Sequence, residues 1–394
     1  MDGKNLYDDY RYLDIDLKDL IDIVRQILRK GFVECIDLSR ENVSTSKLLT
    51  ALQIIGCRGL CVCEDDHKRK CSLEELGFYE DISPSPLRVF ENTEELLYRN
   101  WPTPLVKLRS LSKEDFVVWA KLEYYNPYSM SIKDRISWYM IKNLLLRRRE
   151  FLKKIFYEAT STNTGMALTS LANILGFKTR LFIPSTIQKA SDIILKVLGA
   201  DVIRRPERLT IEMIDKVEEM SRSEGGIHLN QFDNDYNFIV HLRYTAKELD
   251  LQIRYRGIKI RGLIAGIGTS GHFSALSLYM KSRYGDHVKT FAVQPSKDSV
   301  IPGIRRIESG MKWIHMIPYD MIIDVSTEEA VKEAVNIARR EGLFIGLSSG
   351  AVVAGFKKLY EDNIIEPGEY ILIFPDHGFK YIEQFNKYLE SRES

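Results

Sequence analysis

One lysine, Lys133, stands between a proline-containing turn and a predicted amphipathic helix, within residues 126–135 (NPYSMSIKDR). A hydroxyl, a carboxylate and a guanidinium lie beside it in the sequence, on Ser131, Asp134 and Arg135. A lysine amine attacks an aldehyde only when it is held at a fixed place and its proton can leave. The segment alone also fits an ordinary turn with a solvated lysine, so its interpretation depends on four further segments.

Two of these segments are polar turns, each after a predicted strand and before a predicted helix. Residues 160–165 (TSTNTG) follow the apolar residues 155–157, and the next helix is predicted to begin near Met166. Residues 266–271 (GIGTSG) follow the apolar residues 262–265. Free N–H groups at a helix N-terminus bind carboxylates and phosphates, and glycines let the backbone close around a phosphate. Each turn alone also fits an ordinary helix cap.

The other two segments are a small-residue turn, residues 346–350 (GLSSG), and a polar turn at residues 230–234 with the amide of Gln231. The glycine turn at 266–271 also fits the GxGxxG pattern of dinucleotide-binding enzymes. That pattern expects an acidic residue at the end of the next strand. The next predicted strand, 288–293, is followed by Gln294 and Pro295, so we reject a nicotinamide enzyme.

Taken together, these motifs resemble the fold-type II pyridoxal-phosphate enzymes, and within them the cysteine synthase/cystathionine β-synthase family. The family pattern NPxxSxKDR is similar to the lysine segment with one extra residue here, and TSGNTG is similar to the second segment, with Thr162 in place of glycine. The similar segments, in chain order, are residues 126–135, 160–165, 231–232, 266–271, 346–350 and 375–381. The resemblance covers about residues 95 to 385.

This resemblance implies a role for each motif residue. Lys133 would hold pyridoxal 5'-phosphate as an imine and later move the substrate's α-proton, because burial and cationic neighbours lower the pKa of an amine. Asn163 would contact the ring oxygen. Ser348 would face the pyridine nitrogen, and its neutral hydroxyl would favour loss of a β-leaving group. The cofactor phosphate would be bound by Gly266, Gly268, Thr269, Ser270 and Gly271.

The implied reaction is a β-replacement through an α-aminoacrylate intermediate. The substrate's α-carboxylate would be bound by Thr160, Ser161, Thr164 and Gln231. The segment 298–306 resembles the archaeal cysteine synthases that use O-phosphoserine, in which an arginine of this loop binds the substrate phosphate. We therefore expect Arg305 or Arg306 to bind phosphate in a bidentate manner. The sequence does not decide between them.

The expected substrates are O-phosphoserine and sulfide, with O-acetylserine as a second donor. One alternative is a cystathionine β-synthase that acts on serine and homocysteine. Another is a catalytically silent protein of the same fold whose role lies in its N-terminal region. A cofactor absorbance band distinguishes the silent protein from the enzymes.

The composition agrees with an enzyme that acts on small molecules. The 394 residues include 56 Lys and Arg against 55 Asp and Glu, a formal net charge of +1, which gives no reason to expect nucleic acid as a partner. No apolar stretch reaches membrane-spanning length, and no signal peptide begins the chain. We expect a cytoplasmic homodimer.

The order of predicted elements indicates an α/β protein with two doubly wound parallel-sheet domains and a small α/β N-terminal extension. The extension is residues 1–85. The large domain is residues 86–125 and 240–394, and residues 126–239 form a smaller domain that closes over substrate. Ligands are expected between the two domains, at the carboxyl ends of the strands.

The extension is predicted to contain helices at residues 16–28 and 44–55 and strands at residues 32–36 and 59–63. It also holds all five cysteines: Cys35, Cys57, Cys61, Cys63 and Cys71. Zinc bound by Cys57, Cys61, Cys63 and His67 is one interpretation, but the spacing fits no common zinc motif. We therefore expect no metal, and buried or reduced thiols instead.

Overall fold

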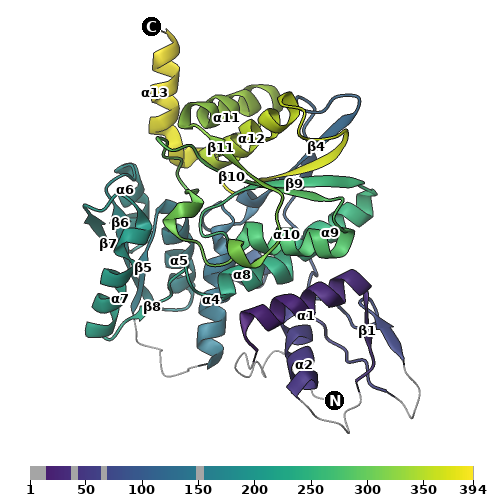
Figure 1. The fold of residues 1–394 in the computed structure, drawn as a ribbon. Coiled ribbons are helices and arrows are strands. Elements are labelled where there is room, and N and C mark those ends of the chain that lie inside the picture. Colours follow the sequence, from purple (N-terminus) through teal and green to yellow (C-terminus); the bar gives the residue numbers. More distant parts are fainter. Residues whose placement is uncertain (1–14, 37–42, 64–68, 148–154, 394) are drawn as a thin grey trace.

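A computed structural model describes residues 15–36, 43–63, 69–147 and 155–393 (Figure 1). These residues form three β-sheets, of six, four and two strands. In the two larger sheets every strand pair is parallel except one at an edge, so the predicted α/β class with two parallel sheets is confirmed. Nowhere in these residues is a helix both long and apolar enough to span a membrane.

A six-stranded sheet forms the larger half of the body. Its strands and covering helices are β3 (Leu105–Lys107), β4 (Phe116–Leu122), β9 (Ile260–Gly266), α10 (Gly271–Tyr284), β10 (Lys289–Pro295), β11 (Met321–Val325), α11 (Thr327–Glu341), α12 (Leu347–Glu361) and β12 (Gly368–Phe374). The strand order is β11-β10-β9-β12-β4-β3, and β3 alone of these strands is antiparallel. Helices α11 and α12 cover one face and α10 the other (Figure 1). Strands covered on both faces are expected to be continuously apolar, as residues 371–374 are.

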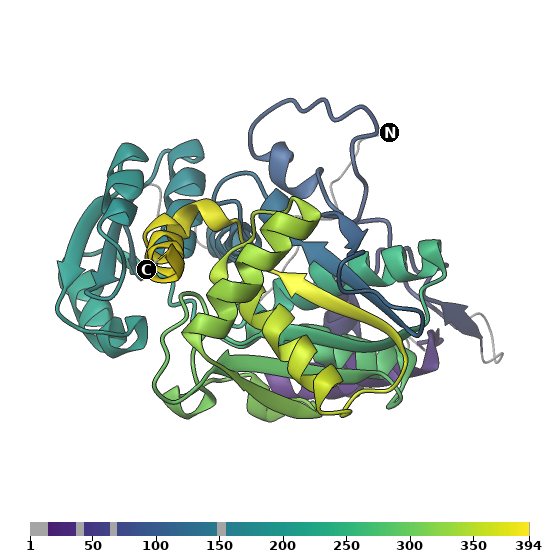
Figure 2. The ribbon, with the colours of Figure 1, turned by 90° about the horizontal axis from the view of Figure 1, so that it is seen from above.

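A four-stranded parallel sheet stands beside the larger one, in teal in Figure 2. Its elements are β5 (Ile155–Ala159), α5 (Thr162–Ile174), β6 (Lys178–Pro184), α6 (Ala190–Val197), β7 (Asp201–Arg205), α7 (Ile214–Ser223) and β8 (Ile227–His228). The strand order is β7-β6-β5-β8. All four strands lie within residues 126–239, and those of the larger sheet lie outside that range. We propose that the chain is divided into a large domain and a small domain, and that the small domain closes over the substrate.

The remaining helices connect the two sheets and end the chain. They are α3 (Glu95–Tyr98), α4 (Lys133–Arg147), α8 (Tyr236–Val240), a π-helical turn (His241–Thr245), α9 (Ala246–Arg256) and α13 (Ile382–Glu393). Helix α4 packs against both α5 and α8, so it lies between the two sheets.

The N-terminal extension is a small α/β unit. It contains α1 (Leu17–Lys30), β1 (Phe32–Glu34), α2 (Val43–Ile55) and β2 (Lys70–Ser72). Helix α1 begins where Asp16 accepts hydrogen bonds from two backbone N–H groups of the first turn, and ends at Gly31 with φ 74°. The predicted strand at 59–63 is wrong: only Val62 forms a bridge, with Ile36. The partner of β1 is β2, which local patterns did not indicate.

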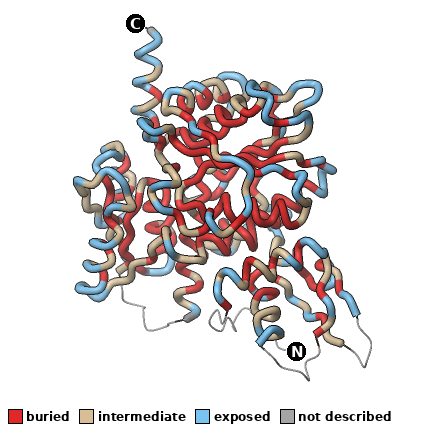
Figure 3. The backbone as a smooth tube through the Cα atoms, viewed as in Figure 1, coloured by how far each residue is buried: buried red, intermediate tan, exposed pale blue. Residues whose placement is uncertain are grey.

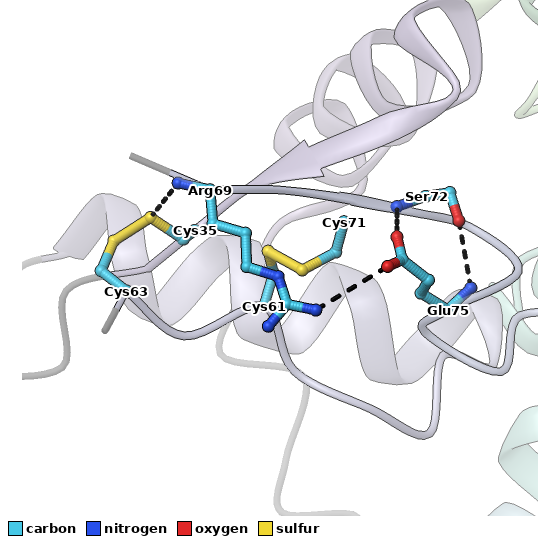
Figure 4. The surroundings of a disulfide bond; sticks show 7 residues. All are labelled: Cys35, Cys61, Cys63, Arg69, Cys71, Ser72 and Glu75. Atoms are coloured by element: carbon cyan, nitrogen blue, oxygen red, sulfur yellow. Dashed lines mark hydrogen bonds and ion pairs between the residues drawn. A yellow bond between two sulfur atoms is a disulfide. The ribbon is translucent and has the colours of Figure 1, made fainter. Parts of the chain in front are cut away.

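Four cysteines form two disulfides, Cys35–Cys63 and Cys61–Cys71 (Figure 4). The Ile36–Val62 bridge and the β1–β2 pairing bring their Cα atoms to 4.9 and 5.7 Å. The expectation of reduced thiols is therefore wrong for these four residues. A zinc site would need the thiolates of Cys61 and Cys63, and both of these residues are in disulfides. The fourth residue of that interpretation, His67, lies outside the described residues.

Buried polar contacts attach the extension to the body. The Asp81 carboxylate accepts hydrogen bonds from Arg243 at 3.0 Å and from Lys247 at 2.9 Å, and Tyr79 donates one to Asp250 at 2.6 Å. Helix α1 packs against α10, and the apolar residues of the extension belong to the same core as those of α8–α10. Figure 3 shows the buried residues concentrated in the body, with fewer in the extension. The extension therefore covers α10, the helix that follows residues 266–271.

Candidate active site

Lys133 is the first residue of α4, and the residues before it pair with the C-terminal part of the chain. The backbone N–H of Ile132 donates to the carbonyl of Pro375 at 2.8 Å, and Ser131 forms an antiparallel bridge with Asp376. The amine of Lys133 makes no hydrogen bond or ion pair within the described residues. Burial lowers its pKa to about 8, although the charge of Asp376 acts in the opposite direction. Such an amine is partly neutral near physiological pH and is available as a base.

The extra residue before Lys133 is accommodated in a tight turn. Met130 has a φ of 46°, in the left-handed region that a non-glycine residue adopts only when its surroundings hold it there. The carboxylate of Asp134 accepts hydrogen bonds from the backbone N–H groups of Tyr128 at 2.7 Å and Ser129 at 2.9 Å. Burial raises the pKa of Asp134 to about 6. Asp134 therefore orders the turn.

The outer residues of the lysine motif belong to a buried ionic network. Arg135 lies 2.7 Å from Glu123 and 2.6 Å from Glu248, and the Lys121 amine lies 2.6 Å from Glu248. Asn126 donates to the carbonyl of Glu123 at 2.7 Å. All four charged side chains are fully buried. This set of Lys121, Glu123, Arg135 and Glu248, here called the Glu248 network, fixes the start of α4 against α9.

The glycine-rich turn after β9 is tightly packed against other parts of the chain. A Cβ on Gly268 would lie 2.5 Å from the carbonyl oxygen of Gly303, and one on Gly271 would lie 2.4 Å from Asn237 Oδ1. A Cβ on Gly266 would lie 2.6 Å from a methyl group of the neighbouring loop. The fold itself therefore requires glycines at these positions.

Unpartnered polar atoms lie around the start of α10. The hydroxyls of Ser270 and Ser274 and the Nε2 atom of His272 are buried without hydrogen-bond partners in the described residues. Burial, with a smaller contribution from Lys133, lowers the pKa of His272 to about 3, so its ring is neutral. Thr269 accepts a hydrogen bond from Asn237 at 2.9 Å. Unpartnered polar atoms at a helix N-terminus are suited to an anionic group.

On the other side, helix α5 begins at Thr162, four residues earlier than predicted, because polar residues form its first turn. Asn163 donates to Asp376 Oδ2 at 2.8 Å, and its own Oδ1 is buried without a partner in the described residues. Thr164 donates to Gln231 Oε1 at 2.9 Å. The side chains of Thr164 and Gln231 therefore lie side by side, as the sequence predicts for residues that act on one group.

One pocket collects residues from both sheets. The predicted site residues that line it are Lys133, Ser161, Thr164, Gln231, Gly268, Thr269 and Arg305. Asn163 lines a smaller pocket that shares Ser161 and Pro302 with the first. Ser348 lies in the first turn of α12, where its Oγ would be 3.8 Å from a Cβ on Gly303, a residue of the larger pocket.

Thr160 and Arg306 line neither of these two pockets. The Thr160 hydroxyl donates to the carbonyl of Ser161 at 2.8 Å. The guanidinium of Arg306 lies 2.9 Å from both Asp324 and Glu308. Arg306 is therefore already paired with two carboxylates.

Arg305 differs from its neighbour. Its guanidinium donates to the carbonyl of Gly268 at 2.7 Å and to Ser309, and it lies over the ring of Phe232. It has no carboxylate partner in the described residues, and burial lowers its pKa to about 10. An arginine without a paired carboxylate, on the wall of a pocket, is suited to an anionic ligand.

Three polar residues near the site were not predicted as site residues. Asp376 and Lys380 lie in the C-terminal motif, and its resemblance to the family was the signal that could have found them. Arg208 lines the larger pocket from the four-stranded side, and no local pattern marks it. These residues reach the site only through tertiary packing.

Comparison with known proteins defines the class. Residues 96–376 match the family described as "Pyridoxal-phosphate dependent enzyme". Cysteine synthase B of Escherichia coli (strain K12) is 31% identical over 286 residues, which cover 71% of this chain and 91% of that protein. The cysteine synthase of Aquifex aeolicus (strain VF5) is 31% identical over 326 residues, which cover 80% and 96%.

A solved structure agrees with these relatives. The O-acetylserine-dependent cystathionine β-synthase from Helicobacter pylori superposes with a TM-score of 0.66 at 25% identity, covering 75% of this chain and 98% of that one. The chain belongs to the cysteine synthase/cystathionine β-synthase family of fold-type II enzymes, and its cofactor is pyridoxal phosphate.

The described residues fit this cofactor. A buried amine with a lowered pKa suits an aldehyde, and the unpartnered hydroxyls of Ser270 and Ser274 at the start of α10 suit a phosphate. The unpartnered amide oxygen of Asn163 lies in the adjoining pocket.

Proposed function

We propose that this protein makes L-cysteine from O-phospho-L-serine and sulfide, with phosphate as the second product. Bound pyridoxal phosphate supplies an electron sink for the negative charge that develops at the substrate's Cα. Lys133 would hold the cofactor and would take the α-proton of the bound substrate. Phosphate leaves Cβ with the electron pair of the C–O bond, sulfide forms the new bond to Cβ, and Lys133 returns the proton to Cα.

The cofactor is oriented by side chains from both sheets. Asn163 would hold the ring oxygen, and Ser348 would face the ring nitrogen with a neutral hydroxyl. The residues proposed to bind the cofactor phosphate are Gly266, Gly268, Thr269, Ser270 and Gly271. Their location between β9 and the N-terminus of α10 supports this role, because the helix N-terminus attracts anions.

The substrate's α-carboxylate is bound by the start of α5 and the Gln231 turn. The proposed residues are Thr160, Ser161, Thr164 and Gln231. Support comes from the hydrogen bond between Thr164 and Gln231 and from the pocket that they share with Lys133. Thr160 lines neither pocket, and its hydroxyl donates to the carbonyl of Ser161, the neighbouring residue of this set.

The environment of Arg305 is the observation that carries the choice of O-phosphoserine. Its guanidinium lies on the wall of the pocket that contains Lys133, with no carboxylate to neutralise it among the described residues. A phosphate leaving group offers two oxygens to such a guanidinium, whereas an acetyl ester offers no negative charge. We therefore propose Arg305, and not Arg306, as the residue that binds the substrate phosphate.

The test compares Arg305→Ala with Arg306→Ala on O-phosphoserine and O-acetylserine, with cysteine formation as the readout. Arg305→Ala is expected to lower kcat/KM for O-phosphoserine about 10- to 100-fold, the effect of a charge-assisted pair, and to change O-acetylserine use little. Arg306→Ala serves as the matched control. Equal losses on both donors in Arg305→Ala would contradict the choice of phosphate.

The same assay addresses the alternatives. The Helicobacter pylori relative, named as an O-acetylserine-dependent cystathionine β-synthase, keeps homocysteine open as an acceptor. Replacing sulfide with homocysteine in the assay tests that reaction. A silent protein of this fold would give no product from any pair. A cytoplasmic homodimer without a metal remains part of the proposal, although two disulfides are more common in oxidising compartments.

A further inference from the structure

Asp376 is a buried carboxylate at the point where the two sides of the site meet. It follows β12, and its residue exposure is 1%. Its Oδ2 atom accepts hydrogen bonds from Asn163 Nδ2 at 2.8 Å and from the hydroxyl of Tyr381. Its backbone carbonyl accepts from Gly346 at 3.0 Å. The carboxylate is thus fixed by α5, by the residues before α12 and by its own segment.

The second carboxylate oxygen, Oδ1, is buried and has no hydrogen-bond partner in the described residues. A Cβ on Gly346 would lie 2.0 Å from this atom, so a glycine is required there for the carboxylate to keep its place. A buried unpaired carboxylate oxygen is costly, and such atoms in native proteins commonly receive a ligand or a transient partner.

Lys133 provides the complementary group. The segment that precedes it pairs with residues 375–377 through the Ile132–Pro375 hydrogen bond and the Ser131–Asp376 bridge. The amine of Lys133 also lacks a partner within the described residues. Two paired segments thus hold an amine and a carboxylate oxygen that are both buried and both without a partner in the described part of the chain.

The other ionisable groups near Lys133 come from three elements. Lys380 follows Asp376 on the C-terminal segment, 3.8 Å from its Oδ2, and donates to the carbonyl of Ser129 at 2.7 Å. His272 lies in α10, and His241 lies in the π-helical turn with its ring centroid 5.9 Å from that of His272. Burial is the main cause that lowers the pKa of each histidine, so both rings are neutral. Among the described residues, Asp376 is the carboxylate whose charge raises the pKa of Lys133, against the lowering by burial.

We propose that Asp376 is a positioning residue whose free oxygen receives the ammonium of Lys133 when that lysine takes the substrate's α-proton. This inference rests on the proposed function of Lys133. In this step the Cα–H bond breaks, its electron pair stays with the substrate, and the proton forms an N–H bond on Lys133. Oδ1 of Asp376 accepts a hydrogen bond from the new ammonium, while Oδ2 keeps its hydrogen bond from Asn163.

The test uses Asp376→Asn, which keeps the shape and removes the negative charge. The full-length apoprotein is mixed with pyridoxal phosphate over a range of pH, and uptake is followed as the absorbance band at about 410 nm. Loss of the carboxylate makes the ammonium less favourable, so the pH midpoint of uptake should fall by about half a unit or more. An unchanged or raised midpoint would overturn the proposal.

Two further variants separate charge from structure. Tyr381→Phe removes a hydrogen bond to Asp376 but keeps the carboxylate, so the midpoint should stay close to that of the wild type. Lys380→Met removes a cation that opposes protonation of Lys133, so the midpoint should rise. If Asp376→Asn does not fold, the Lys380→Met shift alone decides: an unchanged or lowered midpoint would contradict an electrostatic role for this segment.

A kinetic readout distinguishes this inference from the proposed function. With wild-type protein, cofactor uptake at Lys133 and cysteine formation test the function itself. In the loaded Asp376→Asn enzyme, kcat should fall about 10-fold, the size expected when a charge-assisted hydrogen bond is lost, with KM little changed. Normal wild-type uptake and turnover with an unaffected Asp376→Asn variant would reject the inference and leave the function intact.

Discussion

Two buried charge clusters begin within three residues of each other on α4, and they differ in how completely they are paired. In the Glu248 network, two cations and two carboxylates contact each other at 2.6–2.7 Å. In the second cluster, here called the Lys133 cluster and made up of Lys133, Asp376 and Lys380, the Lys133 amine and one oxygen of Asp376 have no partner in the described residues.

This difference separates a structural cluster from a reactive one. Satisfied buried charges resist rearrangement, and removing one partner leaves an uncompensated charge. Unsatisfied groups of perturbed pKa mark the place where a ligand or a transferred proton is accommodated. Of three consecutive residues, Lys133 therefore takes part in the proposed chemistry, whereas Asp134 and Arg135 stabilise the fold around it.

The largest expected effect comes from breaking the paired cluster. Glu248→Gln leaves Arg135 and Lys121 with one carboxylate between them, and should lower the free energy of unfolding by about 3–5 kcal/mol. Denaturant unfolding of the apoprotein measures this change. The matched control is Glu308→Gln, an exposed partner of Arg306, which should lower the free energy of unfolding far less, because exposed ion pairs contribute little. Similar losses in both variants would remove the distinction between the clusters.

In the Lys133 cluster, removal of a charged group is expected to raise the free energy of unfolding instead of lowering it. Because the folded protein lowers the pKa of Lys133 from 10.5 to about 8, its buried ammonium destabilises the fold below pH 8. Lys133→Met should therefore stabilise the apoprotein at pH 7, on the order of 1–3 kcal/mol. The gain should shrink as the pH rises from about 8 to 10.5. Destabilisation at pH 7 would show that the amine is already satisfied.

The smallest expected effect comes from the binding of an anion to the folded protein. If the unpartnered hydroxyls at the start of α10 and Arg305 form an anion site, inorganic phosphate should stabilise the apoprotein. At a phosphate concentration about ten times its dissociation constant, the free energy of unfolding should rise by about 1.4 kcal/mol. Thermal unfolding in phosphate and in chloride of equal ionic strength measures it. Ser270→Ala should reduce the difference, and equal melting temperatures in the two salts would argue against the anion site.

Much of the fold and of the candidate site was predictable, because the sequence patterns that indicate them lie within short segments. Strand–turn–helix order predicted two parallel sheets, and the Lys133, Thr164 and Gln231 motifs predicted residues that share one pocket. Their positions follow from each turn lying at the carboxyl end of its strand.

The features that sequence did not predict depend on long-range packing. Arg305 and Arg306 are adjacent and chemically identical, and only their surroundings leave Arg305 without a carboxylate partner among the residues that the structure describes. The disulfides depend on the pairing of β1 with β2, which no periodicity indicated. Asp376 was visible in a motif, but its relation to Lys133 arises from segments more than two hundred residues apart.

The most direct test of the account is to locate the cofactor on the chain. The loaded protein is reduced with borohydride, digested and mapped by mass spectrometry. We expect a single pyridoxyl-phosphate adduct on the peptide that contains Lys133. In Lys133→Ala, both this adduct and the cofactor's absorbance band at about 410 nm should be lost. An adduct on another lysine, or none, would contradict it.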